Sequence, residues 1–371
     1  MIPAATRFQR FILPGLAFKA VVIGGGYATG RELAEYFLPS GAWGGLAAMA
    51  LATILFSLLC VATFLFARRF AAWDYVSFFK ALLGPGWIAF EAVYIVFIVL
   101  ILAVYGAAAG AIGNALFGWP ALAGTLLLAA AIMLVVAFGN RSVERMFAWV
   151  SVFLYAVYGV FVLLAFTHFG DRIVAAFAVH APMPGWVMGG TIYAGYNIVG
   201  AVVVLPVIRH LTSDRDAVTA GLIAGPLAML PGLLFFMAMI AFNPAIASAI
   251  LPSAFLLQRL GLPLFEVMFQ LMIFAALLES GASSVHAINE RVARAMLVRR
   301  GRELGDWARA GIAIGLLLFC MIVAQQFGLV ALIASGYRAL AYLLIVIYAL
   351  PLLTIGLWRL SKSSQPNEKA A

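Results

Sequence analysis

Residues 22–37 read VIGGGYATGRELAEYF, which places three consecutive glycines and then an Arg-Glu pair inside an otherwise hydrophobic segment. Unwound backbone is tolerated at membrane depth only where it is buried in protein or lines a cavity. Glycine accepts the necessary dihedral angles and lets a ligand approach the main chain. Freed carbonyls can coordinate a cation, and the restarted helix presents N–H groups that suit a carboxylate. The stretch therefore predicts a solute site at Gly24, Gly25 and Gly26. The alternative is a face for close helix packing.

The composition is that of an integral membrane protein. Of the 371 residues, 65% are hydrophobic and 10% are charged, and the mean hydropathy is +1.09. About 20 apolar residues cross the roughly 30 Å hydrocarbon core of a bilayer, and ten segments qualify. These predicted spans lie near residues 12–37, 42–67, 87–113, 120–138, 146–168, 186–208, 217–242, 263–290, 308–325 and 329–358. The chain, residues 1–371, is therefore predicted to be one all-α transmembrane domain.

The basic residues set the predicted orientation. With the N-terminus inside, 18 of the 23 Lys and Arg residues fall in cytoplasmic segments and two in outer ones. This bias predicts ten spans with both termini cytoplasmic, a tail over residues 359–371, and a bacterial-type cytoplasmic (inner) membrane. The net charge of +9 fits contact with anionic lipid. Nucleic acid is not an expected partner, because the basic residues are dispersed over six segments.

The ten spans divide into two sets of five, residues 12–168 and 186–358. An odd number of spans inverts the second set relative to the first. Inverted repeats are typical of secondary transporters whose sites lie at the midplane, between interrupted helices at corresponding positions. The sixth span corresponds to the first, and Gly195, Asn197 and Gly200 lie near its centre. We therefore predict that helices one and six are both broken.

This arrangement resembles the LeuT-type fold of the amino acid, polyamine and organocation transporter superfamily. The stretch GGGYATGRELAEYF and the short LPSGAWGG loop after it are similar to YkvI-type bacterial membrane proteins, which are related to germinant-receptor permease subunits. The resemblance covers the whole chain in architecture and mainly the first two helices in motif. It implies binding of a small solute and no enzymatic activity.

The eighth span reads MIFAALLESGASSVHAINERVARA. Ser280, Ser283 and Ser284 share one helix face by their spacing. In LeuT-type sodium symporters, hydroxyl residues on this helix and carbonyls at the first break form a sodium site. The resemblance therefore implies a possible Na⁺ site at Ser283 and Ser284. Serines that join helices by hydrogen bonds are the alternative.

Glu279 lies near the middle of the eighth span, where an ionised carboxylate normally has a function or a partner. It is expected to carry a coupling proton, to bind a cationic solute group, or to pair with Lys19. Some proton-coupled relatives in the superfamily that the chain resembles carry a lysine on the fifth helix in place of the sodium ion, and the fifth span here has none. His286 and Glu290 follow toward the cytoplasm and are candidates for an inner relay or for structural hydrogen bonds.

Arg31 and Glu32 lie beyond the glycines, toward the outer side. In the sodium-coupled proteins that the chain resembles, an arginine at this offset often forms an extracellular gate with an acid on the tenth helix. The tenth span here supplies Arg338 instead. The resemblance implies a swapped gate, Glu32 with Arg338, which leaves Arg31 to Glu35 or to an anionic ligand. Arg31 and Glu35 are also spaced to neutralise each other.

Polar and aromatic residues near the two predicted breaks complete the predicted pocket. Besides the glycines they are Tyr27, Thr29, Tyr105, Tyr193, Tyr196 and Asn197. Such side chains can enclose a small solute with polar and apolar parts, although each tyrosine can equally serve in packing. Asn197 is the side chain best suited to direct polar contact.

The sequence thus predicts a secondary active transporter, a symporter of an amino acid or similar zwitterion driven by Na⁺ or H⁺. The alternative is a solute-sensing receptor subunit without net transport. No nucleophile-base set, metal-ligand spacing or phosphate loop points to an enzyme, and no cofactor is expected. The sequence sets neither the substrate, nor the coupling ion, nor the number of subunits.

Overall fold

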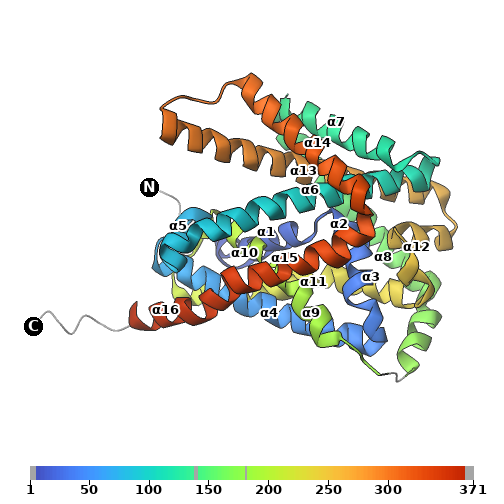
Figure 1. Cartoon of the computed structure of the whole chain (residues 1–371). Coiled ribbons are helices and arrows are strands. Elements are labelled where there is room, and N and C mark those ends of the chain that lie inside the picture. Colours follow the sequence, from blue (N-terminus) through green and yellow to red (C-terminus); the bar gives the residue numbers. More distant parts are fainter. Residues whose placement is uncertain (1–5, 138–140, 180–181, 364–371) are drawn as a thin grey trace, which may run out of the picture.

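The computed structural model describes residues 6–137, 141–179 and 182–363, with only the backbone described at residues 25, 137, 141–151, 298–300 and 363. Every regular element in these ranges is helical (Figure 1). The α-helices are α1 Leu13–Val22, α2 Gly25–Ala28, α3 Arg31–Tyr36, α4 Gly41–Arg69, α5 Tyr75–Leu83, α6 Trp87–Phe117, α7 Ala121–Ala137, α8 Arg141–Ala178, α9 Trp186–Asn197, α10 Val199–Val203, α11 Asp214–Ile240, α12 Pro252–Leu260, α13 Pro263–Arg300, α14 Asp306–Ala331, α15 Arg338–Leu344 and α16 Leu357–Ser363. Short 3₁₀ or π turns are η1 Phe8–Ile12, η2 Leu38–Ser40, η3 Gly84–Gly86, η4 Val207–His210, η5 Ala245–Ser248, η6 Leu332–Tyr337, η7 Ile345–Ala349 and η8 Leu352–Gly356.

Seven helical runs in the described residues are long and apolar enough to cross a membrane. They are Arg31–Arg69, Tyr75–Phe117, Val152–Ala178, Trp186–Val203, Asp214–Ile240, Pro263–Leu297 and Asp306–Lys362. The last run contains both the ninth and the tenth predicted spans, with a kink at Gly328, where φ is 71°. The first predicted span is divided into short helices, and α7 in the fourth has 17 residues. The all-helical, multi-pass prediction is confirmed, while ten crossings in two inverted repeats stay a prediction.

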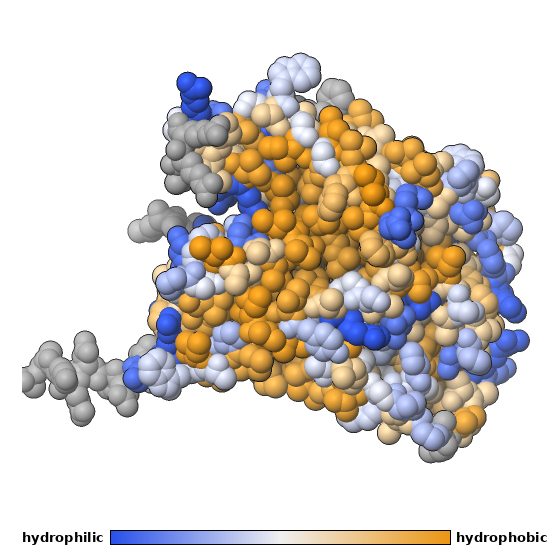
Figure 2. Space-filling model, viewed as in Figure 1, coloured by the Kyte–Doolittle hydropathy of each residue, from blue (hydrophilic) through white to orange (hydrophobic). Residues whose placement is uncertain are grey.

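The outer surface of the bundle is apolar, as a lipid-facing surface must be. Figure 2 shows hydrophobic residues over most of the visible face, with hydrophilic residues gathered toward the two ends of the helices. Ile322 and Phe327 of α14, for example, are 67% and 60% exposed. In water such a surface would be costly, but lipid chains solvate it.

The helices form two packed groups, which can be followed in Figure 1. Helices α6, α7, α13 and α14 pack together, α4 packs against α9 and α11, and α8 contacts both α11 and α13. Small residues set the closest approaches, because a Cβ at Gly225 of α11 would collide with the backbone of α4 at Thr53. A Cβ at Gly110 of α6 would likewise collide with Ala121 of α7. Such glycines let membrane helices associate through van der Waals contact.

The first predicted span is interrupted at its glycines. Helix α1 ends at Val22, and Ile23 has φ −79° and ψ 70°, outside the helical region. Helix α2 restarts at Gly25, and Gly30, with φ 79°, turns the chain into α3. A left-handed residue is tolerated there because glycine has no Cβ.

The corresponding point of the sixth span is not unwound as the sequence predicts, because its backbone stays close to helical. Ile198 lies between α9 and α10, and its φ of −63° and ψ of −20° are helical. The glycines here serve close packing. A Cβ at Gly195 would lie 2.9 Å from Ile345, and one at Gly200 would lie 3.2 Å from Phe18. These two glycines lie at close contacts between helices, and a broken sixth helix is not confirmed.

Candidate solute and ion site

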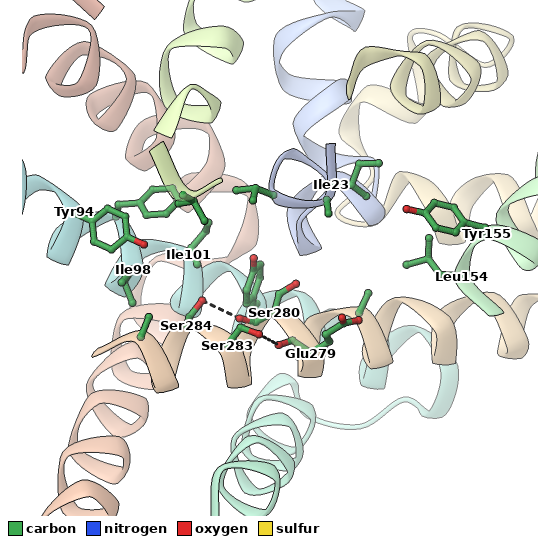
Figure 3. A pocket seen from close by; sticks show the side chains of 17 residues that line it. Ile23, Tyr94, Ile98, Ile101, Leu154, Tyr155, Glu279, Ser280, Ser283 and Ser284 are labelled. Carbon is green, nitrogen blue, oxygen red and sulfur yellow. Dashed lines mark hydrogen bonds between the residues drawn. The ribbon is translucent and has the colours of Figure 1, made fainter. Parts of the chain in front are cut away.

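The main cavity lies where the interrupted first segment faces α13 and has a volume of about 350 Å³. Its walls come from α1, α6, α8, α10 and α13. Figure 3 shows Glu279, Ser280, Ser283 and Ser284 along one side, with Ile23 of the interrupted segment facing them. A cavity of this size is in the range that encloses a small solute.

The three serines line this cavity together, as the helical spacing predicts. The Ser283 hydroxyl donates to the Glu279 carbonyl at 2.9 Å, and the Ser284 hydroxyl donates to the Ser280 carbonyl at 2.9 Å. Each of these two hydroxyls donates its hydrogen to a carbonyl of its own helix, so its oxygen lone pairs remain available to a hydrogen-bond donor or a cation. Oxygen atoms of this kind suit a hard cation.

Glu279 projects into the same cavity and is partly buried. Among the described side chains none forms an ion pair with it. Lys19, the structural partner considered from the sequence, instead places its ammonium 4.2 Å from the ring centre of Tyr155. The expected Lys19–Glu279 pair is therefore not formed, because Lys19 turns toward α8 rather than α13. The other two roles of Glu279 stay open.

A second, smaller cavity adjoins the main one, and we call it the inner chamber. It has a volume of about 20 Å³ and includes Gly24, Glu32, Tyr105, Tyr196, Asn197 and Tyr337 in its lining. Val21, Phe97, Ile101 and Tyr105 line both cavities. The two cavities therefore share part of their walls.

Glu32 is the acidic residue of the inner chamber. Its exposed fraction is 3%, and its Oε2 accepts a hydrogen bond of 2.5 Å from the Tyr196 hydroxyl. A Cβ at Gly26 would collide with its Oε1, so the third glycine of the triplet makes room for this carboxylate. Asn197 also faces the chamber, and its amide donates to the Tyr193 carbonyl at 3.1 Å. The break and Tyr196 thus meet at one carboxyl group.

Comparison with solved structures identifies this architecture. MhsT, solved in complex with L-phenylalanine, has a TM-score of 0.58 and 18% identity, over 97% of this chain and 98% of that one. A manganese transporter of Eremococcus coleocola, bound to an aromatic bis-isothiourea compound, gives 0.51 and 13%, over 94% and 86%. The chain has the LeuT-type fold.

Sequence comparison points the same way. The uncharacterized membrane protein YkvI of Bacillus subtilis (strain 168) is 27% identical over 217 residues, which are 57% of this chain and 61% of that protein. The resemblance of this LeuT-type chain to YkvI is thereby confirmed. No protein-family model matches the chain.

The charged residues that were predicted to form an outer gate pair differently from the prediction. Arg31 binds Glu35 at 2.8 Å and donates to the carbonyls of Ala247 and Ala249 at 2.8 and 3.1 Å. Arg338 also reaches Glu35, at 3.8 Å. The expected pairing of Glu32 with Arg338 is wrong, because Glu35 shares the helix face of Arg31 while Glu32 turns toward α9.

Of the predicted solute-site residues whose side chains or Cα environment the structure describes, five line neither cavity: Gly26, Tyr27, Thr29, Tyr193 and Gly200. Thr29 is fully buried and its hydroxyl donates to the Gly26 carbonyl at 2.7 Å, which braces the turn. Tyr27 lines a separate apolar cavity of about 80 Å³ with Lys19. Tyr193 is fully buried, with its ring centre 4.8 Å from that of Phe37. These side chains pack outside the walls of the two cavities and do not line them.

The two residues considered as an inner relay do not come together. His286 is exposed on α13, while Glu290 pairs with Arg309 of α14 at 2.8 Å. Sequence reasoning also missed Tyr337, whose ring centre lies 4.6 Å from that of Tyr196. The one sequence feature that points to Tyr337 is its position next to Arg338, a charged residue within a predicted span.

Proposed function

We propose that this chain is a secondary active transporter, a symporter of an amino acid or a similar small solute coupled to Na⁺ or H⁺. The observation that carries the proposal is the main cavity, which joins the break in the first segment to Glu279 and the serines of α13. Secondary transporters of this architecture bind substrate and ion at such a break and expose the site alternately to each side. The proposal involves no chemical reaction, in keeping with the expectation that the chain is not an enzyme.

The solved structures support a small-molecule cargo. One LeuT-type neighbour was solved with L-phenylalanine, and another is a manganese transporter. The main cavity of about 350 Å³ suits an amino acid better than a bare metal ion. Among the described residues there is no cluster of three or more His, Cys, Asp or Glu side chains that could hold a metal.

The arrangement of closed and open regions supports alternating access. On one side of the break, the path to the site is closed by the ion pairs of Glu35 with Arg31 and Arg338. The main cavity extends the other way, past Tyr94 and Ala287. Figure 1 puts α5 and α16 at that end of the bundle and α12 at the opposite end. With the predicted orientation, this conformation is open toward the cytoplasm.

Two coupling ions fit the site. For Na⁺, the ligands would be the hydroxyl oxygens of Ser283 and Ser284 together with backbone carbonyls of the interrupted segment, since Val21 and Ile23 line the same cavity. For H⁺, the carrier would be Glu279. With either ion, the binding site lies beside the break. The proposed transport cycle moves this segment, and coupling requires the ion to bind one of its two conformations more tightly than the other.

Uptake by purified protein in liposomes tests the proposal. A mixed pool of labelled amino acids is offered under an inward Na⁺ gradient, an inward pH gradient, or neither. Accumulation under one gradient supports symport and names the ion. Binding without accumulation under any gradient would overturn transport and favour the receptor alternative.

A further inference from the structure

The inner chamber holds a carboxylate that no basic side chain balances. Among the described side chains, none forms an ion pair with Glu32, and neither cavity has an Arg, Lys or His in its lining. An isolated carboxylate buried to this degree is costly unless a positive group accompanies it. The Tyr196 hydroxyl supplies one hydrogen bond but no charge. The chamber is therefore suited to receive a cation.

Aromatic rings cluster around Tyr196, whose hydroxyl binds the same carboxylate. The Tyr196 ring centre lies 4.6 Å from that of Tyr337 and 5.8 Å from that of Tyr36. Tyr105 completes the wall on the side of α6. Faces of such rings attract cations, most strongly where water is excluded. A carboxylate among tyrosine rings is the environment that an organic ammonium group prefers over a bare, strongly hydrated ion.

The size of the chamber limits what enters it. A volume of about 20 Å³ holds one group of about the size of a water molecule, and a primary ammonium is of that size. The rest of a solute would extend past Val21 and Tyr105 into the main cavity.

The nearby cation of the outer gate cannot serve a solute carboxylate instead. Both terminal nitrogens of Arg31 are already bound, Nη1 by the carbonyls of Ala247 and Ala249 and Nη2 by Glu35. The end of the site beside Glu32 is thus negative, and a solute would enter with its positive end first.

We propose that the inner chamber binds the protonated amino group of the solute, with Glu32 as its counter-ion and Tyr105, Tyr196 and Tyr337 as its aromatic wall. Glu32 is then a specificity-determining residue rather than half of the outer gate. This inference rests on the proposed function, because it names the part of the solute that the site recognises.

The test is equilibrium binding to the purified full chain in detergent, read by thermal stabilisation and by calorimetry. The probes are n-propylamine hydrochloride and potassium propionate, each added over a constant excess of sodium chloride. We expect propylamine to stabilise the wild type further in a saturable way and potassium propionate not to do so, whether or not Na⁺ is bound. Equal further stabilisation by the two probes would overturn the proposal.

The decisive comparison is between two carboxylates. Glu32→Gln should weaken propylamine binding at least about tenfold, the loss of a charge-assisted contact worth about 1.4 kcal/mol or more. The matched control, Glu266→Gln, makes the same change near the N-terminal end of α13, at a residue that lines neither cavity, and should leave propylamine affinity within about threefold. Equal affinity in Glu32→Gln and wild type would refute the assignment.

A second variant covers misfolding of Glu32→Gln. Glu32→Asp keeps the charge but draws the carboxylate back by one methylene, so it should bind propylamine measurably more weakly than the wild type. Unchanged affinity there would also refute the site. Because binding in detergent needs no gradient, failed uptake with intact, Glu32-dependent amine binding would overturn transport alone. Gradient-driven uptake with amine binding indifferent to Glu32 would overturn only this inference.

Discussion

Arg10 binds Asp216 through two hydrogen bonds, from Nε to Oδ2 at 2.8 Å and from Nη2 to Oδ1 at 2.7 Å. This pair ties the N-terminal end of the first segment to the start of α11. The Asp216 side chain is 3% exposed and also accepts hydrogen bonds from Thr212 and Ser213. The first segment, which is interrupted at Ile23, is thereby anchored at its N-terminal end.

Arg10→Gln should therefore destabilise the folded protein. Hydrogen bonds to charged groups are stronger than neutral ones, and the loss leaves a buried carboxylate short of partners. We expect a lower midpoint of thermal unfolding in detergent. The matched control is Arg7→Gln, since Arg7 is exposed and makes no ion pair with a described side chain. Equal midpoints in the two variants would show that the Arg10–Asp216 pair does not stabilise the fold.

Glu279→Gln should abolish solute uptake or its dependence on the ion gradient while leaving the protein folded. The substitution keeps the shape of a side chain that faces the main cavity but removes its charge. Uptake in liposomes should fall by about tenfold or more, which corresponds to about 1.4 kcal/mol. Glu266→Gln, on the same helix near its N-terminal end, is the control. Fully coupled uptake in Glu279→Gln would eliminate the role of this carboxylate.

Ser284→Ala should lower the apparent affinity for Na⁺ if sodium is the coupling ion. The change removes one oxygen ligand from the cavity and should raise the half-saturating Na⁺ concentration about tenfold or more. Thr167→Ala removes a hydroxyl with the same backbone hydrogen bond, but on the exposed face of α8. It should leave the Na⁺ dependence unchanged. An unaltered Na⁺ response in Ser284→Ala would show that this hydroxyl is not a Na⁺ ligand.

Gly26→Ala should disturb the inner chamber without touching its charge. The added Cβ would collide with Oε1 of Glu32, so the carboxylate must move. We expect weaker propylamine binding and a lower midpoint of thermal unfolding. Gly159→Ala on α8 is the matched control, because nothing lies within 4 Å of its Cβ position. That change should stabilise by about 0.5–1 kcal/mol, the usual gain from Gly to Ala inside a helix. Like effects at both positions would contradict the packing seen at Glu32.

Asp74, which lies between two membrane-spanning runs, should give a pH-dependent contribution to stability. Burial of the carboxyl acts to raise its pKa, but hydrogen bonds from the Ser77 N–H, the Ser77 hydroxyl and the Val76 N–H prevail, and the pKa lies below the usual value. A lowered pKa in the folded state stabilises at pH values above the unfolded pKa, about 3.9. That stability is lost as the pH falls through the folded pKa.

The measurement is the unfolding midpoint of wild type and Asp74→Asn at pH 7 and at about pH 3.5. Asparagine is also a good N-cap, so it controls for the cap itself. The wild type should lose more stability on acidification than Asp74→Asn. Parallel losses would show that the carboxylate at the start of α5 does not contribute.

Local features of this chain could be predicted from its sequence. Apolar segments of membrane length can bury their backbone polar groups only as helices, so the all-helical architecture followed from composition. The glycine triplet marked the interruption because a residue without a Cβ tolerates it. The Arg31–Glu35 pair and the shared face of Ser280, Ser283 and Ser284 depend only on helical periodicity, which is set within a single helix.

The contacts between helices were decided by the tertiary structure. Glu32 meets Tyr196 across 164 residues of chain, and Glu35 rather than Glu32 meets Arg338. Both acids lie on α3 one turn apart, and only the neighbours packed on each face determine which partner each one finds. The same is true of Tyr337, which enters the chamber because α9 and η6 bring its ring against Tyr196. Sequence periodicity states which residues share a face, but packing in three dimensions decides what that face touches.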